Sequence, residues 1–500
     1  MKNLMFPKFL LAGMQTCPFL IMVFMLNVLA VTAQEKSMVN TSESAYARLY
    51  GPDMDGVTWT GGFWAERFEV CSKTTLPHIW HIYESPEISH AFRNYEIAAR
   101  MVTGEHSGPP FHDGDTYKVL EAIAATYAIT QDRKLDSLMD RIITVIGKAQ
   151  RDDGYIHTPV IIEQNKAGAS TEFRERLNFE SYNLGHLMTA ACIHFRATGK
   201  RSLLEIAIRA TDYLCRFYER ASPELARNAI CPSHYMGVVE MYRTTRNPRY
   251  RNLAKNLIDI RGLVENGTDD NQDRIPFRQQ DKAMGHAVRA NYLYAGVADV
   301  YAETGDTSLW RVLNLIWNDV TRHKLYITGA CGALYDGVSP DGTSYNPSEI
   351  QKTHQSYGRD FQLPNITAYN ESCANIGNLL WNYRMLLVTG EAKYADIMEQ
   401  SLYNSILAGI SLDGKRFFYT NPLRVDKDFP YTMRWKKERE EYIALSNCCP
   451  PNTTRTLAEV SGYAWSVSPE GIWVNLYGSS RIKTKLKNGY PIQLSQKTDY

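Results

Sequence analysis

The amino-acid sequence predicts a mainly α protein, built as an (α/α) barrel in which helical hairpins close into a ring. Two observations carry this prediction: a short phrase recurs through the middle of the chain, and the segments between its copies keep the spacing of amphipathic helices. A third observation, a change to alternating, strand-like segments after about residue 469, adds a β-strand region on the C-terminal side.

The N-terminus, residues 1–33, has the features of a secretory signal peptide. Lys2 and Lys8 supply positive charge, residues 18–30 form an apolar run broken only by Asn27, and Val31-Thr32-Ala33 suits a cleavage site. We therefore expect export to a bacterial periplasm or the extracellular space, with no membrane contact after the signal is removed. An uncleaved anchor is the alternative, although the run is short for a membrane span.

Composition excludes some partners. The 55 Lys and Arg residues balance 54 Asp and Glu residues, so no charge excess favours nucleic acid or an anionic membrane. An aromatic content of 11% permits a carbohydrate-stacking cleft without requiring one. Cys17 leaves with the signal, and the eight remaining cysteines are spread from Cys71 to Cys449, which is not a small disulfide framework. A homo-oligomer stays open.

The recurring phrase is an aromatic residue, two further residues, Thr, a short polar turn, and then Leu or Tyr at the start of an amphipathic run. Its copies centre on Thr130, Thr198, Thr245 and Thr304, and Thr389 repeats it with Leu in the aromatic place. Such a turn is typical of a helix stop followed by polar cap residues. Because the copies are unevenly spaced, hairpins closed into a ring suit them better than a superhelical repeat array, which is the alternative.

Polar, histidine-bearing segments fall between the expected helices, where the loops of a ring converge on one cleft. They lie at residues 108–115, 152–157, 231–234 and 284–286. Their positions suggest polar recognition of a small ligand.

One carboxylate and three thiols occupy two short segments of the chain. Glu371 and Cys373 form a Glu-x-Cys pair, and Cys448 and Cys449 are adjacent. Each segment precedes an expected helix, so loop-to-helix junctions can bring the two together. One oxygen and three sulfur donors suit a tetrahedral zinc site. A disulfide or buried free thiols are the alternatives.

The region 461–500 reads as β-strands after an expected helical domain at 34–460. Residues 471–477 alternate, residues 481–486 follow, and Asn488-Gly489 is a hairpin turn signal before residues 490–494. These strands are too few for a sandwich. Either the sandwich is incomplete or it borrows strands from near Val57-Thr58-Trp59.

Three motifs resemble those of glycoside hydrolase family 127, the family of β-L-arabinofuranosidases. They are residues 363–374, containing Asn370-Glu371-Ser372-Cys373, Gly285-His286-Ala287-Val288-Arg289, and Ser446-Asn447-Cys448-Cys449-Pro450-Pro451-Asn452. The resemblance implies an (α/α)6 barrel followed by β-sandwich modules, of which this chain holds only the start.

The same resemblance implies the site. Glu371, Cys373, Cys448 and Cys449 would bind zinc, and Cys448 would be the nucleophile that attacks the anomeric carbon. A thiolate is a strong nucleophile, and two successive displacements give net retention. The sugar hydroxyls would be held by three histidines: His186, His234 and His286.

One position departs from the family pattern. The general acid/base of the family is a Glu sixteen residues before the zinc-binding Glu, and here that position is Gln355. An amide cannot deliver a proton. Another group, with His354 or Glu180 as candidates, would supply it, or the substrate would need little help, or the site would bind without turnover.

The function expected from these features is a secreted retaining exo-glycosidase of the β-L-arabinofuranosidase type, acting on pectic side chains of plant cell walls. An alternative is a glycosidase for an acidic pectic sugar such as aceric acid, because a Glu would repel a sugar carboxylate that Gln355 tolerates. A non-catalytic zinc-containing carbohydrate-binding protein is a further alternative, and a lyase or epimerase on the same ring is another.

Overall fold

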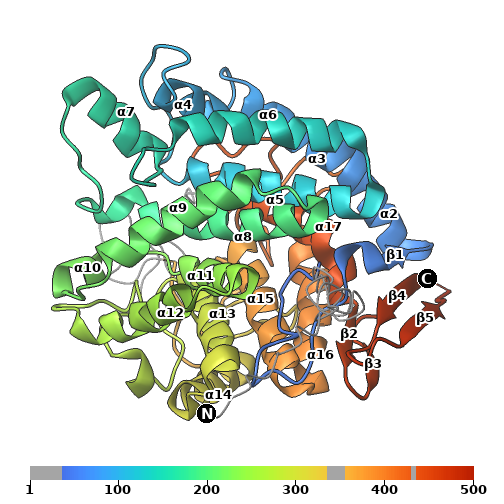
Figure 1. Ribbon diagram of the computed structural model, residues 1–500. Helices are drawn as coiled ribbons and strands as arrows, with labels where there is room; N and C mark the ends of the chain where they lie inside the picture. Colours follow the sequence, from blue (N-terminus) through green and yellow to red (C-terminus); the bar gives the residue numbers. More distant parts are fainter. Residues whose placement is uncertain (1–35, 335–354, 429–434, 500) are drawn as a thin grey trace, which may run out of the picture. The chain divides into compact units, whose positions relative to one another are not determined.

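The computed structural model describes residues 36–334, 355–428 and 435–499. In this part of the chain, six helices form a closed inner ring (Figure 1), in which each helix packs against the next in chain order and the last packs against the first. The ring consists of α5 (His112–Thr130), α8 (Glu180–Thr198), α11 (His234–Thr245), α13 (Ala287–Thr304), α15 (Ser372–Thr389) and α17 (Cys449–Tyr463). The predicted (α/α)6 barrel is confirmed. The expected signal peptide and His354 lie outside the described residues.

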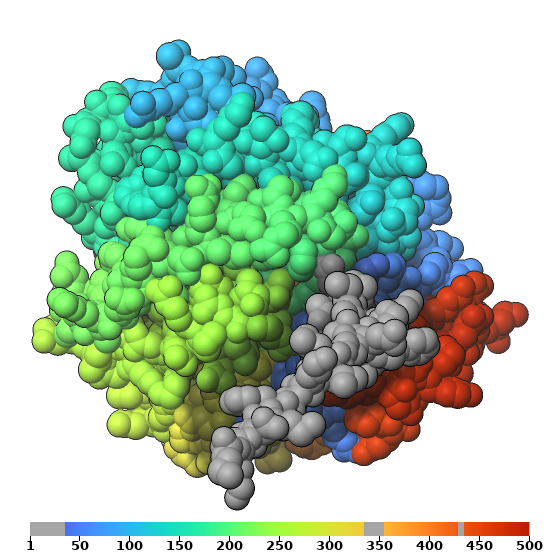
Figure 2. All heavy atoms as spheres, viewed as in Figure 1, coloured from blue at the N-terminus to red at the C-terminus, as the bar shows by residue number. Residues whose placement is uncertain are grey.

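An outer layer of helices returns the chain between the inner ones. It contains α2 (Gly62–Val70), the π-helical turn η2 (Cys71–Thr75), α3 (Leu76–Glu84), α6 (Arg133–Ala149), α9 (Ser202–Phe217), α12 (Pro248–Ile260), α14 (Thr307–His323), α16 (Ala392–Ser401) and η6 (Leu402–Ile406). In the space-filling view α6, α9 and α12 cover one face of the molecule (Figure 2). Because an outer helix leads back from each of the first five inner helices before the next one starts, the inner helices begin at a common end of the ring.

Shorter helices lie in the segments that connect the inner and outer helices. They are α4 (Ala91–Ala98), α7 (Thr158–Ala167), α10 (Pro223–Arg227) and the 3-10 turns η1 (Met54–Gly56), η3 (Arg176–Asn178), η4 (Arg261–Leu263), η5 (Phe277–Gln279) and η7 (Leu407–Gly409). No helix of the described residues is long and apolar enough to cross a lipid bilayer.

The recurring phrase of the sequence is the turn that ends an inner helix. In each copy the Thr hydroxyl donates to the carbonyl four residues earlier and accepts from the amide two residues later, as Thr198 does with His194 and Lys200 at 2.7 and 3.0 Å. The residue after the Thr has a positive φ in every copy: Gln131, Gly199, Arg246, Gly305 and Gly390. Capped carbonyls and a left-handed residue stop the helix, as the pattern predicts.

Two glycines let neighbouring inner helices touch. A Cβ on Gly185 of α8 would lie 2.4 Å from the Cα of His234, and a Cβ on Gly237 of α11 would lie 2.6 Å from the carbonyl oxygen of Gly185. Any side chain at either position would push α8 and α11 apart. This close approach sets His234 beside the first turns of α8.

Small antiparallel sheets lie beside the barrel on the C-terminal side (Figure 1). In one sheet β1 (Val57–Trp59), β4 (Ser480–Lys485) and β5 (Pro491–Gln496) pair in that order, with Val57 opposite Ile482. In the other, β2 (Trp465–Ser468) pairs with β3 (Gly471–Val474). The borrowed strand near Val57 is therefore present, the Asn488-Gly489 turn connects β4 to β5, and β2 is a strand that the sequence analysis did not single out.

Candidate active site

The inner helices begin with chemically functional side chains. The first helical residue or the residue just before it is His112 on α5, Glu180 on α8, His234 on α11, His286 on α13, Glu371 on α15 and Cys448 on α17. Helix N-termini carry unpaired amides and partial positive charge, so their convergence favours anionic groups at this end of the ring. The ring architecture thus collects residues that are far apart in sequence.

Two of these side chains, Glu371 and Cys448, belong to a compact cluster of four donors. The ligand atoms of Glu371, Cys373, Cys448 and Cys449 all lie within 4.8 Å of one another. Sγ of Cys373 is 3.7 Å from Sγ of Cys448, and Sγ of Cys449 is 4.0 Å from Oε1 of Glu371. All four cysteine and carboxylate donors come from the first turns of α15 and α17, as expected for loop-to-helix junctions.

The cluster fits a tetrahedral zinc ion. Two thiolates bonded to zinc at about 2.3 Å lie about 3.8 Å apart in a tetrahedron, and the Cys373–Cys448 separation is 3.7 Å. The sulfur atoms are not bonded to one another, since every cysteine of the described residues is a free thiol. The disulfide alternative is therefore not what the structure shows, and one oxygen with three sulfurs matches the donors that zinc accepts.

Three of the four donors, Glu371, Cys448 and Cys449, are difficult to ionise without a cation. Burial raises the pKa of the Glu371 carboxyl well above its usual range. The Cys448–Cys373 hydrogen bond raises the pKa of Cys448 to about 12, whereas for Cys373 the hydrogen bonds from Cys448 and Cys449 outweigh burial and lower the pKa to about 5. A metal that binds the deprotonated donors would displace these protons.

Access to the cluster is uneven. Glu371, Cys373 and Cys449 are buried, and Cys448 is half-buried. Of the four donors, Cys448 is thus the most exposed. Sγ of Cys448 also accepts a hydrogen bond from the Ser446 hydroxyl at 3.6 Å.

Tyr419 supports the cluster and was not singled out in the sequence. Its hydroxyl lies 4.0 Å from Sγ of Cys448 and hydrogen-bonds the Glu371 carboxylate. Its carbonyl accepts from the Ser372 amide at 3.1 Å, and its ring stacks on Trp435 with centroids 3.6 Å apart. A Tyr within an irregular segment carries no sequence signal for this role, because only the fold brings it to α15.

The three predicted sugar-binding histidines occupy different depths. His286 precedes α13, and its Nε2 is 2.5 Å from Oε1 of Gln355. His234 opens α11 and places Nδ1 3.4 Å from the Cys231 carbonyl. His186 lies a turn deeper in α8, packed edge-to-face on Tyr182 with centroids 4.5 Å apart. Burial holds the pKa of His186 well below its usual range, so its ring is neutral.

The candidate acid positions are also placed. Gln355 is buried, with a φ of 55°, and accepts from His286. Glu180 is engaged elsewhere, since its carboxylate accepts from the Phe173 amide at 2.8 Å and from the Tyr155 hydroxyl. Glu180 thus holds the 173–180 loop onto α8.

Comparison with known proteins identifies the family. Residues 56–462 match the sequence model described as β-L-arabinofuranosidase, glycoside hydrolase family 127 catalytic domain. The chain belongs to this family. The resemblance drawn from the three motifs is therefore confirmed, and the four-donor cluster lies within the matched catalytic domain.

Individual relatives agree with this assignment. The non-reducing end β-L-arabinofuranosidase of Bifidobacterium longum is 29% identical over 451 residues, which are 82% of this chain and 66% of that protein, so the chain spans slightly less than two thirds of its length. A solved glycoside hydrolase is 57% identical, with a TM-score of 0.79 over 93% of this chain and 69% of that one. A family 127 β-L-arabinofuranosidase from Geobacillus stearothermophilus is 33% identical, with a TM-score of 0.79 over 89% of this chain and 71% of that one.

Proposed function

We propose that the protein is a retaining exo-glycosidase that removes terminal β-L-arabinofuranosyl residues from pectic side chains, with Cys448 as nucleophile. The observation that carries the proposal is the cluster of Glu371, Cys373 and Cys449 around a half-buried Cys448. Three enclosed donors and one accessible thiol suit a site in which the fourth ligand also reacts. Its substrate would be an oligosaccharide or polysaccharide.

The chemistry follows from a thiolate beside the anomeric carbon. Zinc bound by these four donors would keep the Cys448 sulfur deprotonated at neutral pH. The sulfur lone pair forms a bond to the anomeric carbon while the carbon–oxygen bond to the leaving group breaks, and that oxygen then takes a proton. Water attacks the same carbon from the opposite face and releases a proton, which replaces the one taken by the departing oxygen, and the carbon–sulfur bond returns its electrons to Cys448. Two inversions leave the configuration unchanged.

The need for a proton donor at the leaving oxygen favours a second candidate substrate. Three carboxyl groups of the described residues that could be considered as donors are already engaged: Asp115 by Lys118 at 2.9 Å, Asp270 by Arg289 at 2.5 Å, and Glu180 by Phe173. Gln355 offers an amide where the family has a carboxylate. An acidic pectic sugar such as aceric acid would meet no like charge there and would bring its own carboxyl group to the reaction.

We also propose that the chain is exported, on the N-terminal charge, apolar run and small residues at 31–33. N-terminal sequencing of the protein recovered from fractionated cells decides this. A first residue at Gln34 in the periplasm or medium is the expected result, and a full-length cytoplasmic product would contradict it.

The nucleophile is tested by mass spectrometry and kinetics. An aryl β-L-arabinofuranoside, offered to the zinc-loaded enzyme and quenched rapidly, should leave one sugar residue on the Cys448 peptide. Cys448→Ala should lower kcat by about 10⁴-fold or more, whereas Cys215→Ala, at a buried thiol of the outer helix α9, should leave it unchanged. Full activity of Cys448→Ala on every substrate would refute the mechanism.

A further inference from the structure

A lysine lies buried beside the residue that carries the nucleophile candidate. Lys118, on α5, has no exposed side-chain surface. Its Nζ lies 2.9 Å from Oδ1 of Asp115 and 3.5 Å from the backbone carbonyl oxygen of Cys448, and it also hydrogen-bonds the Tyr182 hydroxyl. The three acceptors come from three helices of the ring: α5, α8 and the start of α17.

An ammonium group suits this position for a geometric reason. It has three donor hydrogens directed apart, and each acceptor of Lys118 takes one of them. Asp115, also fully buried, is the acidic partner of Lys118 in this ion pair. A planar guanidinium would not direct its donors toward three separated acceptors in the same way.

The contact with Cys448 is to its main chain. Cys448 is the residue that precedes α17, and its carbonyl belongs to the first turn of that helix. Holding the carbonyl limits rotation of this peptide, and that rotation would swing the Cα–Cβ bond and the thiol. Lys118 therefore acts on the direction of the sulfur without touching it.

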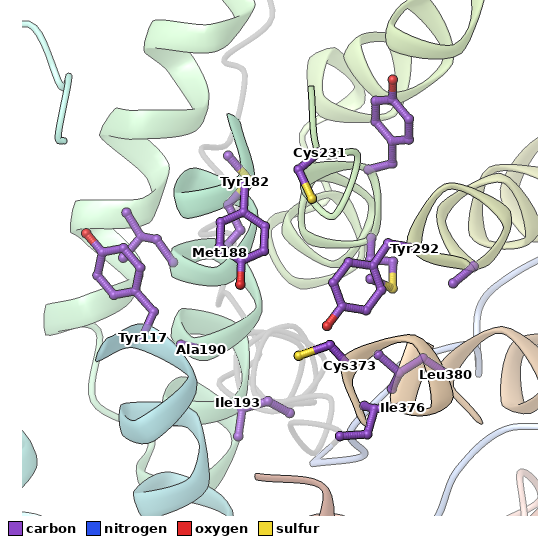
Figure 3. Packing of buried hydrophobic residues seen from close by; sticks show 14 of the residues in the cluster. Tyr117, Tyr182, Met188, Ala190, Ile193, Cys231, Tyr292, Cys373, Ile376 and Leu380 are labelled. Carbon is purple, nitrogen blue, oxygen red and sulfur yellow. The ribbon is translucent and has the colours of Figure 1, made fainter. Parts of the chain in front are cut away.

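A second side-chain hydrogen bond of Lys118 goes to the hydroxyl of Tyr182 on α8. Figure 3 shows the hydroxyl groups of Tyr182 and Tyr292 directed toward the Cys373 thiol. The Tyr292 hydroxyl accepts from Nδ2 of Asn452 at 2.9 Å, and Tyr182 is held by Lys118. The Lys118 ammonium thus links Tyr182 to the peptide of Cys448, the nucleophile candidate.

We propose that Lys118 is a positioning residue for Cys448, and that it holds the Cys448 thiol and the Tyr182 side chain at a fixed separation. The proposal rests on Cys448 being the nucleophile. Misplacing a reacting atom by about 1 Å costs about 10²-fold in rate. Loss of Lys118 should accordingly lower kcat by about 10- to 100-fold. KM and the zinc content should stay close to those of wild type, since the hydrogen bonds of Lys118 go to Asp115, Tyr182 and the Cys448 carbonyl and not to a metal donor.

The test uses the zinc-loaded full chain and two variants of the lysine. Lys118→Met alone leaves the buried Asp115 carboxyl without its partner, so Asp115→Asn with Lys118→Met is made beside it to remove both groups of the ion pair. Tyr182→Phe removes the hydroxyl that accepts from Lys118. The matched control is Lys324→Met, because Lys324 is also buried, forms an ion pair with Asp319 at 2.8 Å and donates to the Ala283 carbonyl.

Measured quantities are kcat, KM, zinc per chain and the rate at which the sugar adduct forms on Cys448. We expect lower kcat and slower adduct formation in both Lys118 variants at normal zinc content. When Lys118→Met is combined with Tyr182→Phe, the fold-loss in kcat should be smaller than the product of the two separate fold-losses. Wild-type kcat in the folded double variant, or a loss of kcat that only follows a loss of zinc, would overturn the proposal. Equal losses in Lys324→Met would overturn it too.

Failure of this proposal is distinct from failure of the mechanism. If Cys448 is not the nucleophile, Cys448→Ala is active and no adduct forms in wild type. If only the role of Lys118 is wrong, Cys448→Ala is inactive, the wild-type adduct forms, and the Lys118 variants behave like wild type.

Discussion

The side-chain oxygen of Gln355 lies 2.5 Å from Nε2 of His286. With His286 donating to that oxygen, the amide nitrogen of Gln355 keeps its N–H groups as donors. Gln355 can thus hydrogen-bond a sugar oxygen or carboxylate, but it has no acidic proton to give. The pair joins a predicted sugar-binding residue to the position that departs from the family pattern.

Gln355→Glu should change substrate preference. Wild type should be slow on an unactivated arabinobioside and less slow on an aryl β-L-arabinofuranoside, because an acid at the leaving group is worth about 10²- to 10⁴-fold. The variant should gain on arabinosides if the pocket suits arabinose, and should lose on acidic pectic oligosaccharides through repulsion between carboxylates.

The measurement is kcat/KM of both enzymes on the three substrates, with Gln355→Ala to separate the new charge from the lost amide. Efficient cleavage of the arabinobioside by wild type, together with no effect of Gln355→Glu, would show that another residue carries the proton. His354 is then the first candidate, because the Glu180 carboxylate already accepts from Phe173 and Tyr155.

Zinc should be present at one ion per chain. Glu371→Gln, Cys373→Ala and Cys449→Ala should each lower zinc occupancy, and Cys373→Ala with Cys449→Ala should abolish it, because two of four buried donors are then gone. Elemental analysis after dialysis against a weak chelator gives the stoichiometry. Cys215→Ser is the control for removing a buried thiol, and full zinc in the double variant would rule the site out.

Arg246→Gly should stabilise the protein. Arg246 is exposed and has a φ of 60°, a conformation that costs a side chain about 1 kcal/mol and costs glycine little. The free energy of unfolding should rise by about 0.5 to 1 kcal/mol. Gln131→Gly is the contrast, since the Gln131 side chain donates to the carbonyls of Tyr127 and Ala128, and its loss should cancel the gain. Chemical denaturation reports both, and an unchanged or lower midpoint for Arg246→Gly would contradict the argument.

Asp306 should make stability depend on acid pH. Partial burial acts to raise its pKa, but hydrogen bonds from Ser308 and Arg278 outweigh this and lower the pKa to about 2. A folded-state pKa below the unfolded value means that the stabilisation is complete above about pH 4 and is lost as the pH falls toward 2. Asp306→Asn should therefore cost about 1 to 2 kcal/mol at pH 7 and little at pH 2.

The comparison uses Asp132→Asn as its control. Asp132 caps α6 by accepting from the Lys134 amide at 2.9 Å, as Asp306 caps α14, but it forms no ion pair in the described part of the chain. Urea unfolding of the three proteins from pH 7 to pH 2 should show a gap between wild type and Asp306→Asn that closes on acidification. A gap of constant size would mean that the Asp306 charge is not the cause.

Much of the helical architecture is legible in the sequence because its signals are local. A Thr whose hydroxyl bonds its own helix, followed by a residue that tolerates a positive φ, ends a helix wherever it stands, so Thr198 and Thr304 mark real boundaries. The Asn488-Gly489 turn is local in the same sense. Strand β2 was missed because Trp465–Ser468 directly follows α17 and is buried along its whole length, which removes the alternation that marks a half-buried strand.

The donor set of the site was also readable. Glu371 and Cys373, like Cys448 and Cys449, are close in sequence at the start of a helix, so each pair is local and only their meeting is tertiary. Tyr419 and Lys118 gave no such signal. A Tyr outside any helix or strand and a Lys within a helix are ordinary residues until packing sets them against Glu371 and the Cys448 carbonyl.

The sequence by itself determined the helical hairpins, the family and the identity of the four donors, because each depends on bonding within a few residues or on a short motif. Only the tertiary structure decided that Cys448 is the most exposed donor, that Lys118 binds the Cys448 carbonyl, and that Gln355 is paired with His286. These depend on the closure of α17 against α5 and on the touching backbones of α8 and α11. Exposure, pKa and hydrogen-bond direction are properties of groups packed together from distant segments, so no single stretch of the chain encodes them.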